Sequence, residues 1–97
     1  MSDDCVELSV VIPAYNEADN FGKGVLDQVQ EYLSRRSYRS EVIVVDDGST
    51  DDTVKLVKDY IKGKSSWRLV ANPHQGKAQA VARGIAAVQY DAVLFTD

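Results

Sequence analysis

Residues 42–45 form an uncharged, almost wholly β-branched run that ends directly in Asp46 and Asp47. Continuous apolar runs favour strands of a parallel sheet, which are covered on both faces. Adjacent residues of a strand point to opposite faces, so one carboxylate can face a crevice while the other braces the following turn. Placing both at one strand end is unfavourable unless something binds there. The run therefore predicts a buried parallel strand that ends at a binding site.

Further apolar runs at residues 8–12, 67–71 and 92–95 have the length of strands. Between the runs, apolar residues at helical spacing predict three helices. The first has a stripe of Phe21, Val25, Val29 and Leu33, with Asp19 or Asn20 as its cap. The resulting order, β-α-β-α-β-α-β, predicts an α/β fold with a parallel sheet, right-handed crossovers and helices on both faces.

The second and third helices are predicted with their ends and their buried faces. The second begins at a Ser49 or Thr50 cap, has Asp51 and Asp52 in its first turn, and ends at Gly63. Its buried side consists of Val54, Val57 and Ile61. The third runs from Lys77 or Ala78 to Val88, and its alanines predict close packing on the sheet. Its inward residues are predicted to be Ala78, Val81, Ala82 and Ile85.

Composition limits the class of protein. The chain of 97 residues suits one compact domain, and its net charge of -4 argues against sequence-independent binding of nucleic acid. Cys5 is the sole cysteine, and the acidic start is unlike a signal peptide. No apolar run approaches the roughly 20 residues of a membrane span, so a cytoplasmic setting is expected. Because residues 92–97 end in an apolar run and Asp97, we expect an N-terminal fragment of a longer protein that self-associates through exposed apolar surface.

Candidate binding residues follow the strands, where ligands of open parallel sheets bind. After the first strand, Pro13 fixes the exit of the chain and Tyr15 offers a ring that either stacks on a nucleobase or packs on a neighbouring loop. Glu17 either caps the first helix or holds a ribose hydroxyl. These alternatives place a nucleotide among the expected ligands.

The acidic pair and the loop before the third helix have alternatives too. Asp46 and Asp47 fit a helix-capping turn, but an acceptor for ribose hydroxyls or a base N–H accounts better for two carboxylates. Lys77, at a helix N-terminus, suits a phosphate or lies in solvent. It belongs to no Walker A loop, because Ala78 replaces the needed Ser or Thr. His74 is expected to be an ordinary surface loop residue.

The motifs together resemble family 2 glycosyltransferases of GT-A fold, most closely the polyprenyl-phosphate (dolichyl-phosphate) mannosyl- and glucosyltransferase branch. The resemblance rests on residues 10–17, 44–51, 76–78, 83–85 and 95–97 in that order. It implies a Rossmann-like, three-layer α/β/α architecture with strand order 3-2-1-4. It also implies that residues 1–97 are the nucleotide-binding half of a GT-A domain and that the acceptor half is absent.

Carried over to this sequence, the resemblance implies a set of nucleotide-sugar-binding residues: Pro13, Ala14, Tyr15, Glu17, Val45, Asp46, Asp47, Lys77 and Asp97. Asp47 and the backbone of Val45 would hold base or ribose, while Asp46 would brace the loop or share that contact. Asp97 matches the first Asp of the DxD motif, whose second Asp is missing, so Asp97 alone should hold Mg²⁺ or Mn²⁺ weakly.

The implied reaction transfers a sugar, with inversion, from a UDP- or GDP-linked donor to a polyprenyl phosphate or a glycan hydroxyl. The fragment itself is expected to be inactive, with the longer protein in the cytoplasm or at the cytoplasmic face of a membrane. The alternatives are a non-catalytic nucleotide-binding or assembly module of the same fold and a receiver-like signalling domain. In a receiver the acidic pair follows the first strand, whereas here Pro13 to Glu17 follow it.

Overall fold

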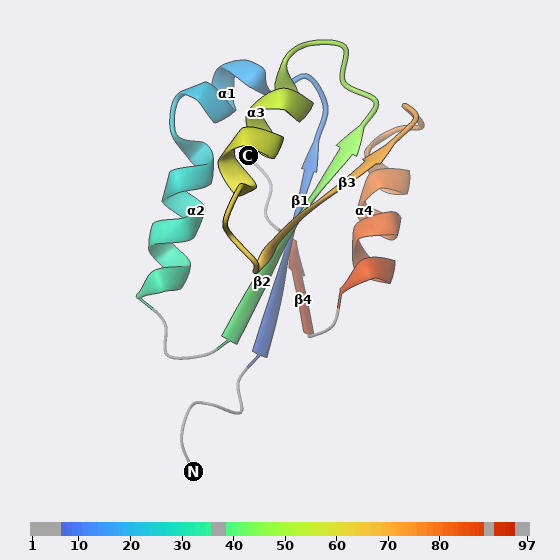
Figure 1. Ribbon diagram of the computed structural model, residues 1–97. Coiled ribbons are helices and arrows are strands. Elements are labelled where there is room, and N and C mark those ends of the chain that lie inside the picture. Colours follow the sequence, from blue (N-terminus) through green and yellow to red (C-terminus); the bar gives the residue numbers. More distant parts are fainter. Residues whose placement is uncertain (1–6, 36–38, 89–90, 95–97) are drawn as a thin grey trace.

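The computed structural model describes residues 7–35, 39–88 and 91–94. Strands and helices alternate along the chain (Figure 1): β1 (Glu7–Ala14), α1 (Ala18–Gly22), α2 (Val25–Ser34), β2 (Arg39–Asp47), α3 (Thr53–Ile61), β3 (Trp67–Asn72), α4 (Lys77–Ala87) and β4 (Asp91–Leu94). All strand pairs are parallel, and the order across the sheet is β3-β2-β1-β4. The α/β class and the parallel sheet are confirmed. Phe95, Thr96 and Asp97 lie outside the described residues.

Helices cover the sheet on both faces, which gives three layers (Figure 1). On one face, Val10 and Val44 pack with Leu26 of α2 and Val57 of α3. On the other face, Val11, Ile43 and Val45 pack against Ala80 of α4. Neighbouring residues of a strand point to opposite faces. The uninterrupted apolar runs are therefore explained by burial on both faces, as expected for parallel strands.

The first predicted helix is wrong in its continuity. It is divided into α1 and α2, and Gly24 stands between them with a left-handed φ of 97°. Glycine adopts this conformation readily because it has no Cβ. The predicted cap is also wrong, because Glu17 precedes α1 and the Thr53 hydroxyl accepts a hydrogen bond from the Glu17 N–H at 2.8 Å. A neighbouring loop thus completes the helix start that Asp19 or Asn20 was predicted to cap.

The predicted start of the second helix is wrong as well. Helix α3 begins at Thr53 rather than after Ser49 or Thr50, so Asp51 and Asp52 precede its first turn. The Asp51 carboxylate accepts a hydrogen bond from the Thr53 N–H at 2.9 Å, which satisfies a backbone donor at the helix start. The hydrogen bond from the Thr53 hydroxyl to this carboxylate has the largest effect on the pKa of Asp51 and lowers it, and the Thr53 N–H lowers it further.

The third predicted helix has the right extent and the wrong inward face. Ala80 and Gly84 are buried, whereas Ala78, Ala82 and Ile85 are exposed and Val81 is half-buried. The cause is Gly84: a Cβ built there would lie 2.4 Å from Cγ1 of Val11 and 2.8 Å from Cγ2 of Val45. The missing side chain lets the backbone of α4 approach the sheet closely. The predicted close packing is therefore present, through a different stripe of residues.

Candidate functional site

The carboxyl ends of β1, β2 and β3 and their following loops surround a cavity of about 240 Å³. Its lining consists of Pro13, Ala14, Tyr15, Glu17, Asp47, His74, Lys77 and Ala80. Six of the predicted site residues are in this set. Val45 is fully buried in the core and Asp46 is not in the lining, while Asp97 lies outside the described residues. The sheet thus brings most of the predicted residues to one place, and their roles in binding stay a prediction.

Asp47 connects the end of β2 to the loop that precedes α4. Its Oδ1 accepts the Gln75 N–H at 2.8 Å, and its Oδ2 accepts the Gly76 N–H at 3.0 Å. Nδ1 of His74 lies 2.8 Å from Oδ2, and because an ionised carboxylate only accepts, Nδ1 carries the hydrogen. The Gln75 N–H, then the Gly76 N–H and His74, lower the pKa of Asp47 against the opposing effect of burial.

This bonding leaves Asp47 able to bind something else. A carboxylate offers about four lone-pair positions, and the loop occupies three of them in the described residues. Asp47 also lines the cavity, with its side chain almost fully buried. An anionic acceptor in this position suits a ribose hydroxyl or a base N–H, as the sequence predicts.

Asp46 belongs to the turn and not to the cavity. Its Oδ2 accepts the N–H groups of Gly48 and Ser49, each at 3.0 Å, and its Oδ1 accepts the Ser49 hydroxyl. Asp46 is buried at the end of β2 on the opposite face from Asp47. The geometry therefore gives Asp46 the bracing role, one of the alternatives that the sequence leaves open.

Tyr15 and His74 form an aromatic pair at the cavity. Their ring centroids are 4.2 Å apart and their planes differ by 18°, which is a stacked arrangement. Gly48 makes room for the His74 loop, because a Cβ on Gly48 would lie 2.5 Å from the His74 backbone nitrogen. Sequence reasoning missed His74. Its position two residues after the end of β3, at the ligand-binding edge of the sheet, was the available signal.

Asn16 holds the loop after β1 against the loop after β2. Its Oδ1 accepts the Thr50 N–H at 2.8 Å and the Asp51 N–H at 3.3 Å, while its own N–H donates to the Ser49 hydroxyl at 2.9 Å. Asn16 has a left-handed φ of 52°, an uncommon conformation for a residue other than glycine. These bonds fix the position of the neighbouring Tyr15. Sequence reasoning missed this contribution too.

Lys77 is the first residue of α4 and lines the cavity with its exposed side chain. Backbone N–H groups of a first helical turn have no partner within the helix and suit an anion. Beside them, the Arg83 guanidinium donates to the Gln75 side-chain oxygen at 3.3 Å, from α4 to the loop before it. Glu17 lies at the other side, where its carboxylate accepts the Asn20 side-chain amide at 2.8 Å.

A metal site does not form from the residues that the structure describes. Among them, no group of at least three His, Cys, Asp or Glu side chains is placed to hold an ion. The Asp47 carboxylate, the obvious candidate in the cavity, already accepts bonds from the loop. The described residues therefore do not fit a metal by themselves, and metal binding at Asp97 stays a prediction. Within the same described ranges, no helix is both long and apolar enough to cross a membrane.

Comparison with known proteins identifies relatives over most of the chain. The sequence model described as "Glycosyl transferase family 2" matches residues 9–97. Dolichyl-phosphate beta-glucosyltransferase of Dictyostelium discoideum is 39% identical over 90 residues, which cover 84% of this chain and 27% of that protein. The protein of the same name from Homo sapiens is 35% identical over 99 residues, covering 94% and 30%. The chain thus spans under a third of the length of these relatives.

Solved structures show the same architecture. A mannosyltransferase from Pyrobaculum calidifontis, PcManGT, solved in complex with GDP-Man and Mn²⁺, matches with a TM-score of 0.71 and 30% identity. That match covers 84% of this chain and 24% of the other. TarS of S. aureus matches with a TM-score of 0.72 at 22% identity over 93% of this chain and 27% of the solved one, and supports the fold alone.

Proposed function

The chain belongs to glycosyltransferase family 2, and on that premise we propose that its cavity binds the nucleotide of a nucleotide-diphosphate sugar. One observation carries the proposal: the Tyr15 ring and the Asp47 carboxylate line the same cavity beyond the strand ends. A nucleoside can use both groups: its base can stack on the flat ring, and its base N–H groups or ribose hydroxyls can donate hydrogen bonds to the carboxylate. The solved relative with bound GDP-Man supports the choice of ligand.

The proposed arrangement gives the nucleoside and the diphosphate different partners in the cavity. Tyr15 stacks on the base, and Asp47 accepts hydrogen bonds from the base or the ribose. Lys77 and the first turn of α4 follow the loop that is bonded to Asp47, and there a cation and the N–H groups of a helix start would attract the diphosphate. The nucleotide would then lie along the carboxyl edge of the sheet, over the end of β2.

The proposed reaction is substitution at the anomeric carbon with inversion. An acceptor oxygen forms a bond to that carbon, and the bond to the diphosphate breaks, so that the nucleoside diphosphate leaves with the electron pair. Two relatives are named dolichyl-phosphate beta-glucosyltransferase, and these names support glucose as the proposed sugar and a polyprenyl phosphate as the proposed acceptor. Such an acceptor is already anionic, so its attack needs no general base to remove a proton. A glycan hydroxyl is the other acceptor that the sequence leaves open.

Residues 1–97 would supply donor binding, and they span under a third of the length of the curated relatives. We expect this chain alone to bind nucleotide and to transfer no sugar. The second Asp of the DxD motif would hold a divalent ion that stabilises the leaving diphosphate. That residue is not in this sequence. The residues described here therefore account for donor binding only.

Calorimetry tests the proposal directly. The chain is titrated with UDP, GDP, UDP-glucose and GDP-mannose, with and without Mn²⁺, and with free glucose as a ligand that lacks a nucleotide. Binding of at least one nucleotide and no binding of glucose is the expected result. Absence of heat with every nucleotide at millimolar concentration would overturn the proposed function.

A further inference from the structure

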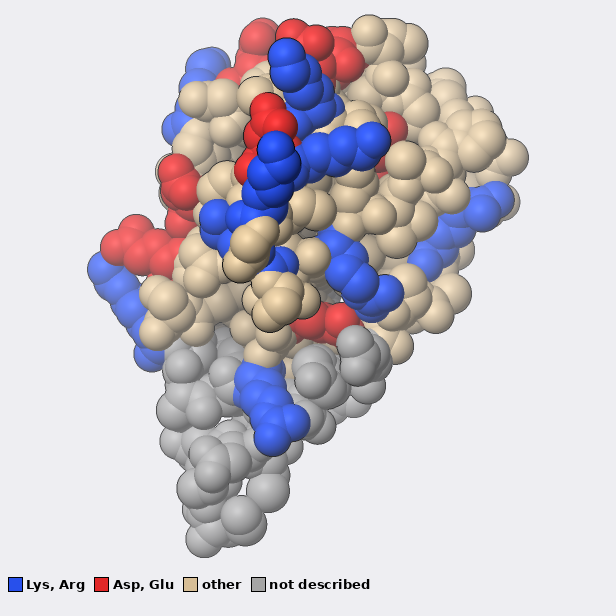
Figure 2. Space-filling view, viewed as in Figure 1, with Lys and Arg blue, Asp and Glu red and all other residues tan. Residues whose placement is uncertain are grey.

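The cavity lies at an acidic end of the molecule. Figure 2 shows acidic side chains together at the end toward which β1 and β2 run. Asp46, Asp47, Asp51 and Asp52 all belong to the end of β2 or to the segment between it and α3. Such a field does not attract an anion, so a diphosphate held by Lys77 alone should bind weakly. The affinity for a nucleotide therefore depends on the contacts that its base makes.

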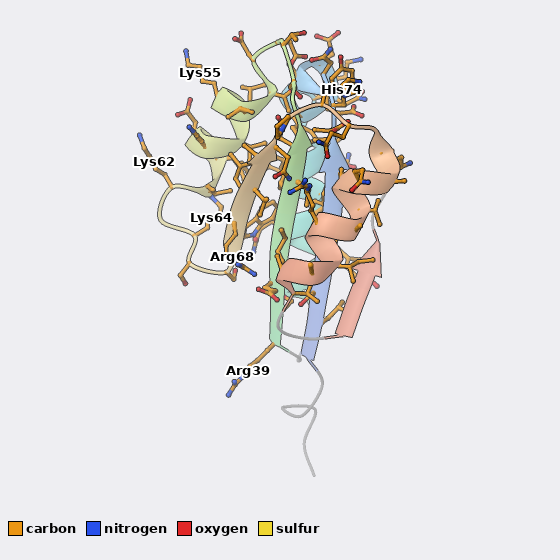
Figure 3. The ribbon with its side chains drawn as sticks, turned by 90° about the vertical axis from the view of Figure 1, so that its right-hand side faces the viewer. Arg39, Lys55, Lys62, Lys64, Arg68 and His74 are labelled. Carbon is orange, nitrogen blue, oxygen red and sulfur yellow. The ribbon has the colours of Figure 1, made fainter. Side chains whose placement is uncertain are left out.

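His74 occupies the contacts that a base would need. Figure 3 places His74 at the end of the molecule toward which β2 runs, opposite Arg39 at the start of that strand. The imidazole stacks on the Tyr15 ring, with centroids 4.2 Å apart and planes that differ by 18°. Its Nδ1 lies 2.8 Å from Oδ2 of Asp47. One side chain thus uses both groups that are proposed to hold a nucleoside.

Imidazole resembles a nucleobase in the two properties that these contacts use. Both are flat heteroaromatic rings, so both can stack on Tyr15. Both can carry an N–H at the ring edge, and the Nδ1–H of His74 donates to the Asp47 carboxylate as a base N–H would. The face of Tyr15 that His74 covers is therefore a face from which a stacked ring also reaches Asp47.

A base cannot enter between the two rings while the loop stays in place. A third ring would need a separation of roughly 7 Å, twice the contact distance of about 3.5 Å between carbon atoms. The observed centroids are 4.2 Å apart. Moving the whole loop outward would break the hydrogen bonds that the Gln75 and Gly76 N–H groups donate to Asp47. The backbone is therefore held, and the imidazole itself has to leave.

The imidazole can turn away without a change of the backbone. The His74 side chain is 55% exposed, whereas that of Asp47 is 5% exposed. Rotation about the Cα–Cβ bond of His74 to another staggered rotamer takes the ring into solvent. The hydrogen bond that Asp47 then loses is replaced by one from the base N–H. The buried carboxylate thus keeps its partners, which avoids the cost of leaving it unsatisfied.

We propose that His74 occupies the base position of the nucleotide-free protein and that the nucleobase displaces it on binding. This inference rests on the proposed function, because it takes Tyr15 and Asp47 as the nucleoside site. His74 then sets the affinity for the nucleotide: the apparent dissociation constant is the intrinsic one divided by the fraction of molecules in which the site is open. Removal of the imidazole should therefore tighten binding.

Calorimetry with UDP and GDP compares the unmodified chain with three variants. His74→Ala removes both contacts, and His74→Asn keeps a side-chain N–H for Asp47 but has no ring. Gln75→Ala is the control, because it alters the same loop through a side chain outside the cavity lining. Inorganic pyrophosphate is titrated into the same samples as a ligand without a base, and thermal unfolding checks that each variant is folded. NMR records contacts between ring protons of Tyr15 and His74 with and without nucleotide.

We expect His74→Ala to bind the nucleotide about tenfold more tightly, the factor that corresponds to the loss of a competing aromatic pair. His74→Asn should gain less, because its amide still donates to Asp47. Gln75→Ala should bind as the unmodified chain does, and neither His74 variant should gain affinity for pyrophosphate. The contacts between the Tyr15 and His74 rings should disappear when nucleotide is added, and contacts between Tyr15 and the base should replace them.

A His74→Ala variant that binds nucleotide no more tightly than the unmodified chain would overturn the displacement, since His74 would then have no effect or would hold the base. Equal tightening in Gln75→Ala, or tightening toward pyrophosphate, would also overturn it, because a looser loop or a change of charge would be the cause. Ring contacts that persist in the bound state would place the base on the other face of Tyr15, with the same consequence.

The same titrations distinguish this inference from the proposed function. Absence of nucleotide binding in the unmodified chain and in every variant overturns the proposed function and the displacement together. Nucleotide binding by the unmodified chain, without a gain in His74→Ala, overturns the displacement alone.

Discussion

The rings of Tyr15 and His74 stack on each other with centroids 4.2 Å apart, although they come from loops on either side of β2. The pair lies beside Asp47, which accepts a hydrogen bond from His74 and lies at the end of β2. A planar surface and an anionic acceptor are therefore joined in one unit. A base that stacks on Tyr15 must displace His74 or stack on the free face of the ring. Either way, Tyr15 and Asp47 are the residues whose substitution tests the site.

Two substitutions of Tyr15 distinguish the contribution of its ring to nucleotide binding from that of its hydroxyl. Tyr15→Ala is expected to weaken nucleotide binding roughly tenfold or more, since stacking of one base on an aromatic ring is worth about 1–3 kcal/mol. Tyr15→Phe keeps the ring and should bind as the unmodified chain does. Calorimetry with the nucleotide that binds best measures both. Equal weakening in the two variants would mean that the hydroxyl, and not the stack, carries the interaction.

Replacing Asp47 affects both the ligand and the loop. Asp47→Asn is expected to lower nucleotide affinity roughly tenfold through loss of a charge-assisted acceptor. The Gln75 and Gly76 amides, which donate to the carboxylate, should exchange with solvent faster. The pKa of Asp47 is lowered from its usual value of 3.8 in the folded state. The stability that the Asp47 carboxylate contributes to the folded state is therefore present above pH 3.8 and is lost as the pH falls below that value. Hydrogen exchange by NMR measures the exchange rates of the Gln75 and Gly76 amides. The control is Asp59→Asn, at an exposed position of α3, which should leave these rates unchanged.

Sequence patterns in which apolar and charged residues are sharply separated predicted the structure well. The β-branched run at residues 42–45 predicted a central strand, and β2 is buried on both faces with Val44 and Val45 fully inaccessible. The position of the acidic pair at its end followed directly from the strand. The receiver-like alternative is excluded by the same placement, because the pair follows β2 and not β1.

The wrong predictions fall where apolar and polar residues are weakly separated along the sequence, or where loops distant in the sequence contact each other. In α4, alanine fits exposed and buried positions alike, so the sequence does not show which side of the helix is buried. The close approach of Gly84 to Val11 determines that side. The role of His74 depends on its contact with Asp47, 27 residues earlier, which no local pattern records. Asn16 is similar, since its partners belong to the loop after β2.

Gly84 tests how closely α4 approaches the sheet. Gly84→Ala would place a Cβ 2.4 Å from Cγ1 of Val11, and the overpacking should cost about 1–3 kcal/mol of unfolding free energy. Gly22→Ala is the matched control, because a Cβ there meets nothing within 4 Å. It should be neutral or slightly stabilising, as alanine is the better helix former. Urea denaturation measures both variants, and a Gly84→Ala variant as stable as the control would contradict the close approach.

Asn16 tests the connection between the loops that follow β1 and β2. Asn16→Ala removes the acceptor of the Thr50 and Asp51 amides and leaves a side chain with a Cβ at φ 52°, so it should lose about 1–3 kcal/mol. Asn16→Asp keeps an acceptor oxygen and should restore most of that stability. Asn16→Gly tolerates the backbone conformation and should fall between them. Urea midpoints that place Asp below Gly would show that the conformation matters more than the hydrogen bonds.

Tyr60 provides a test at alkaline pH, away from the cavity. Burial, followed by a hydrogen bond and the charge of Asp27, raises the pKa of Tyr60 from 10.0 to about 12. The folded state thus retains the proton of Tyr60 where the unfolded state has lost it. The resulting stability is fully present below pH 10 and is lost as the pH rises from 10 toward 12. In Tyr60→Phe this part of the pH dependence should disappear, whereas Tyr32→Phe, an exposed position, should retain it. Unfolding midpoints measured across this range, with tyrosinate absorbance recorded in parallel, check the sign: a Tyr60→Phe variant that loses stability as steeply as the unmodified chain would contradict it.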